Sequence, residues 1–295
     1  MKNCLIFLFL FFYVNTSFSQ RVYVFDSESK KIIPYVNVSY IKYDNIIDAD
    51  YCNEDGFIDI KSKENFDKIE FSCIGYENKL INTINDTIFL IKKIITLDEV
   101  VISKKNLTFS KIGYTKCKKK TTLSASRGFQ LCVYIENTFQ EKKVIKSVLF
   151  KVKRRDNFKT AIRIHFYKKQ IEKLEPAEEI LTEDIIRYFD EKSKENIEID
   201  VSKYGLELPI EGAFVGIEWL GIVDWKTGEF IESKEFWSDT SIELNDSINK
   251  PFTFMKSRIK KHDWINTEKI KEDLKETLKF KNYPNASFGI KVFNQ

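Results

Sequence analysis

Short runs in which apolar and polar residues alternate recur along the chain. Between residues 20 and 92 these runs are rich in β-branched and aromatic residues and are bounded by Asp, Asn, Ser, Gly or Pro. A period of two with these residue types predicts β-strands that bury one face each. The runs begin at Arg21, Val36, Phe57, Lys68 and Thr87. We therefore expect a small β-sandwich in this part of the chain.

Longer runs of the same kind follow in residues 113–295, and they predict a second, larger β-sandwich. They begin at Phe129, Lys146, Ala161, Asn196, Ala213 and Ala286. Ile270, Leu274 and Leu278 are spaced i, i+4 and i+8, which predicts one short amphipathic helix. Residues 180–189 fit a helix, a loop or an apolar strand. The predicted fold class is all-β, with two consecutive β-sandwich domains.

Two glycines mark predicted turns in the first part. In the stretch "NEDGFIDI", Asp55 and Gly56 are residue types that tolerate a positive φ, and an alternating run starts at once behind them. This predicts a β-hairpin whose second strand begins at Phe57. Gly75 should end the run "IEFSCI", and we expect the Tyr76 ring to pack while its hydroxyl reaches a backbone partner.

The order of several motifs in residues 20–92 carries a resemblance to a known family. The motifs are "VFDSESKKIIPYVNVSY", "NEDGFIDI", "IEFSCIGY" and the final "IFLIKKIITLDEVVI". They resemble the carboxypeptidase regulatory-domain-like family. The resemblance implies a prealbumin-like, seven-stranded β-sandwich of a kind common in exported proteins of Gram-negative bacteria. The matching residues are Asp26, Pro34, Asn37, Val38, Asp55, Gly56, Phe57, Gly75 and Tyr76.

The rest of the chain carries weaker resemblances. Residues 113–295 resemble an envelope-associated β-sandwich of unassigned function, which implies no catalytic residues. Residues 93–112 are predicted to be a linker, in which trypsin should cut first near Lys104 or Lys105. Residues 95–105 resemble the phrase that leads into the plug of TonB-dependent receptors. A degenerate N-terminal fragment of such a receptor therefore stays an alternative.

The first 19 residues have the pattern of a secretory signal peptide. Lys2 is followed by an apolar run from Cys4 to Val14 and by the small-residue site "SFS". The run is too short for a membrane-spanning helix, which needs about 20 apolar residues. We expect an exported protein, periplasmic, associated with the outer membrane or secreted, with no integral membrane span after signal cleavage.

The charge of the chain bears on its partners. The chain has 48 basic and 44 acidic residues, a near balance that does not indicate a nucleic-acid partner.

Four cysteines follow the signal segment, Cys52, Cys73, Cys117 and Cys132. Export permits disulfides, but buried thiols are the preferred interpretation for a chain of this size. Whether any of the four form disulfides stays open.

The sequence patterns predict no catalytic, metal-binding or cofactor-binding residue. The two histidines, His165 and His262, are far apart in the chain, whereas a catalytic zinc needs three organised ligands. In "AIRIHFY", Ile162 and Ile164 share one face of the predicted strand. Alternation therefore places His165 on the opposite face, where we expect it to be exposed.

Glu218 and the tryptophans are the candidate ligand-binding residues. A carboxyl group against an indole, as in Glu218 beside Trp219, can take part in proton transfer, so a glycosidase-like hydrolase is the alternative function. Indole rings can also stack on sugars. Trp219, Trp225, Trp237 and Trp264 are candidates for such a platform, with core packing preferred for Trp219.

These patterns together predict an exported, non-catalytic cell-envelope protein. Its first sandwich would be a docking or spacer module, and its second sandwich would bind an envelope protein or a glycan. No cofactor is implied.

Overall fold

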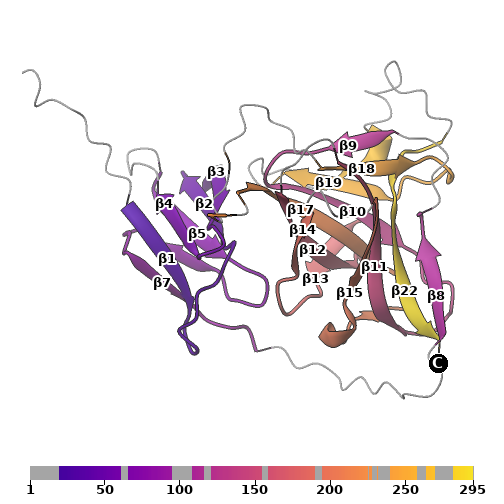
Figure 1. The fold of residues 1–295 in the computed structure, drawn as a ribbon, viewed down its shortest axis with the longest axis horizontal. Helices are drawn as coiled ribbons and strands as arrows, with labels where there is room; N and C mark the ends of the chain where they lie inside the picture. Colours follow the sequence, from indigo (N-terminus) through magenta and orange to yellow (C-terminus); the bar gives the residue numbers. More distant parts are fainter. Residues whose placement is uncertain are drawn as a thin grey trace, which may run out of the picture.

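The computed structural model describes residues 20–60, 66–94, 108–115, 121–154, 159–189, 195–224, 226–227, 231, 240–257, 264–269 and 282–294. Strands dominate these residues, and they pack as layered sheets in two adjacent units (Figure 1). The predicted all-β fold is confirmed. No helix among these residues has the length and apolar character needed to cross a membrane.

The N-terminal sandwich consists of strands β1 to β7 in two sheets. One sheet has the order β4-β1-β7 and the other the order β3-β2-β5-β6. The strands are β1 (Gln20–Asp26), β2 (Asn37–Lys42), β3 (Asn45–Tyr51), β4 (Phe57–Ile60), β5 (Lys68–Ser72), β6 (Lys79–Ile81) and β7 (Thr87–Leu90). Val22 and Val24, at alternate positions of β1, pack in the core with Val38, Phe71 and Leu90. The predicted period of two therefore builds this core.

The predicted β-hairpin at Gly56 is wrong in its pairing. β3 pairs with β2, whereas β4 pairs with β1 in the other sheet, so the turn carries the chain from one sheet to the other. The hairpin of this region joins β2 to β3 through Tyr43 (φ 50°) and Asp44 (φ 58°). Sequence patterning missed it because tyrosine is not a typical residue of a left-handed turn.

Gly56 nevertheless has the conformation expected of it, with φ of 67°. A Cβ atom at this position would lie 2.2 Å from Ile32 Cγ2 and 3.0 Å from the carbonyl oxygen of Ile33. We expect Gly56→Val to lower the free energy of unfolding by about 1–3 kcal/mol because of backbone strain and this collision. Chemical denaturation measures the change. Asp55→Val, at an exposed neighbouring position, is the control, and equal stability of the two variants would contradict the expectation.

The C-terminal sandwich consists of strands β8 to β22. Its first sheet has the order β13-β12-β17-β10-β19-β20, with β14 also paired to β12. These strands are β10 (Phe129–Ile135), β12 (Lys159–Lys169), β13 (Pro176–Glu179), β14 (Ile186–Phe189), β17 (Ala213–Val223), β19 (Thr253–Ser257) and β20 (Ile265–Asn266). β12 and β17 are neighbours within it and pair antiparallel over almost their whole length.

The second sheet of this sandwich has the order β21-β18-β11-β22-β8, with β15 and β16 paired to β11 and β9 paired to β18. Its strands are β8 (Thr108–Gly113), β9 (Thr122–Ser124), β11 (Lys143–Arg154), β15 (Asn196–Asp200), β16 (Glu207–Leu208), β18 (Thr240–Asn245), β21 (Asn285–Ala286) and β22 (Phe288–Asn294). Ile164 and Trp219 from the first sheet pack with Val148, Phe150 and Ile290 from the second.

Strands β8, β13 and β14 lie in segments that the sequence assigned to a linker or left undecided. The undecided stretch around 180–189 contains no helix: strands β13 and β14 lie on either side of a loop. Residues 108–112, predicted to be linker, belong to β8, which pairs with β22. The predicted helix at 270–278 and the predicted trypsin sites at Lys104 and Lys105 lie outside the described residues.

Three cysteines lie within the described residues, and all three are buried free thiols. They are Cys52, Cys73 and Cys132. Burial raises the pKa of each thiol. Cys117 lies outside the described residues. The structure therefore agrees with the preferred interpretation for the three cysteines that it describes.

Candidate binding site at the junction of the two sandwiches

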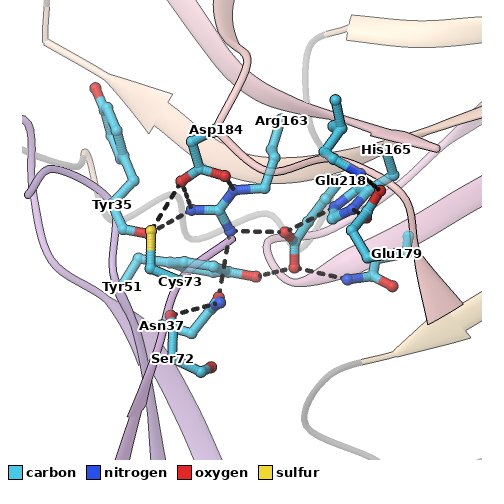
Figure 2. Close-up of polar contacts among 12 residues, drawn as sticks. Tyr35, Asn37, Tyr51, Ser72, Cys73, Arg163, His165, Glu179, Asp184 and Glu218 are labelled. Atoms are coloured by element: carbon cyan, nitrogen blue, oxygen red, sulfur yellow. Dashed lines mark hydrogen bonds and ion pairs between the residues drawn. The ribbon is translucent and has the colours of Figure 1, made fainter. Parts of the chain in front are cut away.

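The side chains of β12 and β17 that face away from the C-terminal core form a buried polar cluster. Arg163 and Glu218 are 0% exposed and His165 is 3% exposed. The predicted exposure of His165 is therefore wrong, although its predicted face of the strand is right. The N-terminal sandwich covers this face of the sheet, as the contacts of Arg163 and Glu218 show (Figure 2).

Arg163 connects the two sandwiches. Its guanidinium contacts Asp184 through Nε at 2.9 Å and Nη2 at 3.0 Å, and Glu218 Oε2 through Nη1 at 2.9 Å. Nη2 also donates to the backbone carbonyl of Tyr35, at 2.6 Å, across the junction. Burial lowers the pKa of Arg163, but the Asp184 and Glu218 carboxylates outweigh it and raise the pKa above its usual value. The guanidinium is thus a permanent buried charge.

Glu218 accepts hydrogen bonds from both sandwiches. Its Oε1 accepts one from the Tyr51 hydroxyl at 2.8 Å and one from Gln130 Nε2 at 3.1 Å. Its Oε2 contacts Arg163 and lies 3.3 Å from His165 Nε2. Because its neighbours Ile217 and Trp219 face the core, alternation along β17 turns the carboxylate toward the N-terminal sandwich. Glu218 is therefore a structural anchor between the two units.

An apolar cluster surrounds this polar centre. Tyr35 and Tyr51 of the N-terminal sandwich pack with Ala161, Leu220 and Val223 of the C-terminal sandwich, and all five side chains are buried. The hydroxyl of Tyr35 also forms a short hydrogen bond to that of Tyr188. The junction, by which we mean this cluster with the Arg163 and Glu218 network, is thus both apolar and ionic.

The backbones of the two units approach each other closely at Gly75. Its φ is 83°, and a Cβ atom there would lie 2.1 Å from the carbonyl oxygen of Thr182. Gly75 was predicted only to end a strand, but it also permits this close approach. The Tyr76 hydroxyl donates to Asp26 Oδ2 at 3.0 Å, so the prediction of a backbone partner is wrong.

His165 lies between two carboxylates. Nδ1 is 2.5 Å from Glu179 Oε2 and Nε2 is 3.3 Å from Glu218 Oε2. Burial lowers the pKa of His165, but Glu179 and Glu218 outweigh this effect and raise the pKa from 6.5 to about 8. The Tyr167 ring stacks on the imidazole, with ring centroids 5.3 Å apart. Two carboxylates thus favour the charged imidazole despite its burial.

A cleft opens beside this cluster, and residues of both sandwiches line it. We call it the junction cleft; its volume is about 640 Å³. Tyr167 and Trp264 meet in it edge to face, with ring centroids 5.3 Å apart. Its lining consists of Asn37, Glu70, Ser72, Cys73, Ile74, Gly75, Asn78 and Lys93 from the N-terminal side, and of Gln130, His165, Tyr167, Ala177, Glu178, Glu179, Leu181, Lys256 and Trp264 from the C-terminal side.

The predicted ligand-binding residues do not form one site in the structure. Trp219 is buried in the core, where its Nε1 donates to the carbonyl of Thr240 at 3.2 Å. Glu218 lies beneath the junction cleft and is not among its lining residues. Trp225 and Trp237 lie outside the described residues. Trp264, also considered for an aromatic platform, does line the cleft.

Sequence reasoning missed Arg163, Glu179 and Asp184. One signal was available for Arg163, because a charged residue in the middle of an apolar strand has to be paired if the strand is buried. Glu179 and Asp184 had no such signal, since both stand in an acidic stretch of undecided structure. Among the described residues, no group of three or more His, Cys, Asp or Glu side chains is arranged to hold a metal ion.

Comparisons with known proteins give little further information. No family model and no curated protein matches the chain. Among solved structures, the chain is similar to a crystal structure of the cysteine protease and lectin-like domains of Cwp84, a surface layer associated protein of Clostridium difficile. The TM-score is 0.36 and the identity is 10%, and the match covers 94% of this chain and 63% of the other. A likeness of this size supports no assignment of function.

The match does correct one prediction. The sequence predicted that the protein is not an enzyme, but the matched structure includes a cysteine protease domain. That expectation is withdrawn, and at this level of similarity the match does not establish enzyme status.

Proposed function

We propose that this protein is an exported cell-envelope protein that binds a carbohydrate in the junction cleft. The composition of the cleft carries the proposal: Trp264 and Tyr167 stand beside amide and carboxylate side chains that come from both sandwiches. Sugar rings present an apolar face that stacks on aromatic rings and hydroxyl groups that pair with amides and carboxylates. A few polar groups beside an aromatic wall are typical of a ligand site.

The polar groups of the cleft are already oriented by neighbours. Gln130 Oε1 accepts from the Tyr167 hydroxyl at 3.3 Å, and Asn78 Nδ2 donates to Glu70 Oε1 at 3.3 Å. Glu179 Oε1 accepts from the backbone amide of Phe166 at 2.8 Å. Such contacts reduce the side-chain entropy that is lost when a ligand binds. They support a site that is largely formed before its ligand arrives.

The other parts of the proposal rest on the sequence. The pattern of residues 1–19 supports export to the periplasm, the outer membrane or the exterior. In residues 20–92 the motif order supports membership in the carboxypeptidase regulatory-domain-like family, and strands β1 to β7 form sheets of three and four strands. In this proposal the N-terminal sandwich is a docking module that supplies one wall of the cleft.

Removing the Trp264 ring tests the proposal. We expect Trp264→Ala to weaken binding of N-acetylglucosamine oligomers or soluble peptidoglycan fragments by about tenfold or more, because the stacking surface is lost. Isothermal titration calorimetry measures the affinity, and the same mixtures can be checked for cleavage of the glycan. Tyr43→Ala, which removes an aromatic ring that is 79% exposed in the β2–β3 hairpin, is the control.

Two results would contradict the proposal. One is the absence of binding by the unmodified protein across both classes of glycan. The other is binding that Trp264→Ala and Tyr43→Ala leave equally strong.

A further inference from the structure

The hydrogen-bonding pattern of His165 requires a particular protonation state. Both ring nitrogens face carboxylate oxygens, Glu179 Oε2 and Glu218 Oε2. An ionised carboxylate only accepts hydrogen bonds, whereas a neutral imidazole has one donor and one acceptor nitrogen. Only the imidazolium can donate to both carboxylates at once. The geometry therefore favours a charged His165, independently of any titration value.

The charges around His165 lead to the same conclusion. Glu179 of β13 and Glu218 of β17 face its ring, and Asp184 adds a third carboxylate through its ion pair with Arg163. Arg163, two residues before His165 on β12, supplies one positive charge. With a charged His165 the cluster has two cations for three carboxylates; with a neutral one it has a single cation. Loss of the proton thus raises the number of carboxylates without a counter-charge in the cluster from one to two.

Four other side chains that touch the cluster carry no positive charge. The phenol ring of Tyr167 stacks on the imidazole, and the Tyr51 hydroxyl and the Gln130 amide donate hydrogen bonds to Glu218. Cys73 contacts the Asp184 end of the cluster, where its thiol donates to Asp184 Oδ2 at 3.1 Å. None of these four side chains provides a cation; the other charged groups of the adjoining cleft are Lys93, Lys256, Glu70 and Glu178.

We infer that His165, as the imidazolium, is a positioning residue that couples the junction cleft to the docking of the N-terminal sandwich. Through Nδ1 it holds Glu179, whose side chain is 22% exposed, in the wall of the cleft. Through Nε2 it supports Glu218, which accepts from Tyr51 of the other sandwich. The coupling to the ligand rests on the proposed function, whereas the coupling to the docking does not.

The direction of the pH dependence follows from the raised pKa. The value is 6.5 for an unperturbed histidine and about 8 in this cluster. Stabilisation by the imidazolium is therefore complete below about pH 6.5 and is lost as the pH rises through about 8. Docking and glycan affinity should both weaken at alkaline pH.

Nuclear magnetic resonance of the imidazole tests this inference without any ligand. The chain has two histidines, so His262→Gln leaves the signals of His165 alone. We expect both of its ring nitrogens to be protonated at pH 7, and the amide signals of Tyr35 and Tyr51 to change with the same midpoint near pH 8. In His165→Gln these amide signals should not follow that titration. A neutral His165 at pH 7, or junction signals that ignore its titration, would overturn the inference.

Two further measurements test the inference without the His165→Gln variant. Glu179→Gln removes one carboxylate and should shift the midpoint of His165 to lower pH; an unchanged midpoint would count against the inference. In the unmodified protein, affinity for the N-acetylglucosamine oligomers should fall about tenfold from pH 6.5 to pH 9. If these glycans bind with an affinity that does not change with pH, the coupling is wrong and the proposed function stands. If no glycan binds but His165 and the junction titrate together, the proposed function fails alone.

Discussion

Replacement of Arg163 by methionine is expected to destabilise the junction by about 3–5 kcal/mol. The substitution keeps much of the apolar volume but leaves the buried Glu218 and the partly buried Asp184 without their guanidinium. Removing one partner of a buried ion pair typically costs this much, because the other charge stays desolvated. It also removes the hydrogen bond to the Tyr35 carbonyl. Urea unfolding measures the loss of stability.

A matched control exists in the N-terminal sandwich. Arg21 pairs with Asp59 at 2.9 Å, but the two side chains are 50% and 46% exposed. Arg21→Met should therefore change the stability far less than Arg163→Met does, because water already screens this pair. After a trypsin cut at the predicted sites near Lys104 or Lys105, the two fragments of the unmodified protein and of Arg21→Met should elute together in gel filtration, whereas those of Arg163→Met should separate. If the fragments of both variants elute in the same way, the buried pair does not hold the sandwiches together.

A methyl group at Gly75 is expected to open the junction without removing any charged or hydrogen-bonding side chain. In Gly75→Ala the new Cβ would meet the carbonyl oxygen of Thr182 at 2.1 Å, and this oxygen belongs to the backbone and cannot rotate away. The positive φ of 83° adds strain of about 1–3 kcal/mol. Cys73, which is buried two residues before Gly75 and contacts Asp184, reports on the opening. Alkylation of its thiol should become at least about tenfold faster, since it requires local opening.

Gly56→Ala is the control for this experiment. Its Cβ would collide with Ile32 of the N-terminal sandwich, so the strain arises within one unit and not between the two. Mass spectrometry of the alkylated peptides identifies Cys73 in both variants. The expectation fails if Gly56→Ala and Gly75→Ala accelerate the labelling of Cys73 to the same extent.

Local sequence patterns predicted the strands well, because alternation reports directly on burial. The runs at Arg21, Val36, Phe57, Lys68 and Thr87 all form strands, as do the longer runs of the C-terminal sandwich. Strand pairing was predicted less well. The turn at Gly56 has the expected conformation, yet the strand behind it pairs with β1 rather than with its neighbour β3. Pairing depends on contacts that are distant in sequence, and residue spacing does not report them.

The candidate site was hidden from the sequence for a related reason. Alternation along β12 correctly separates Ile164 from His165, but it does not tell what covers the second face. Here the cover is another sandwich, whose contributions come from Tyr35 and Tyr51, far from β12 in the chain. Glu218 was singled out for its neighbour Trp219, which faces the opposite layer. The Glu218 carboxylate instead contacts Arg163 and His165 on the adjacent strand.

The hydrogen bonds of Tyr35 and Tyr51 across the junction join segments that the ribosome synthesises at different times. The ribosome completes the N-terminal sandwich early, before the residues that contact the Tyr35 carbonyl and the Tyr51 hydroxyl across the junction exist. Their partners Arg163 and Glu218 are synthesised 128 and 167 residues later. A nascent chain therefore displays an unfinished, aromatic docking face until β17 has been made. Such a face is a surface that a chaperone can shield during synthesis.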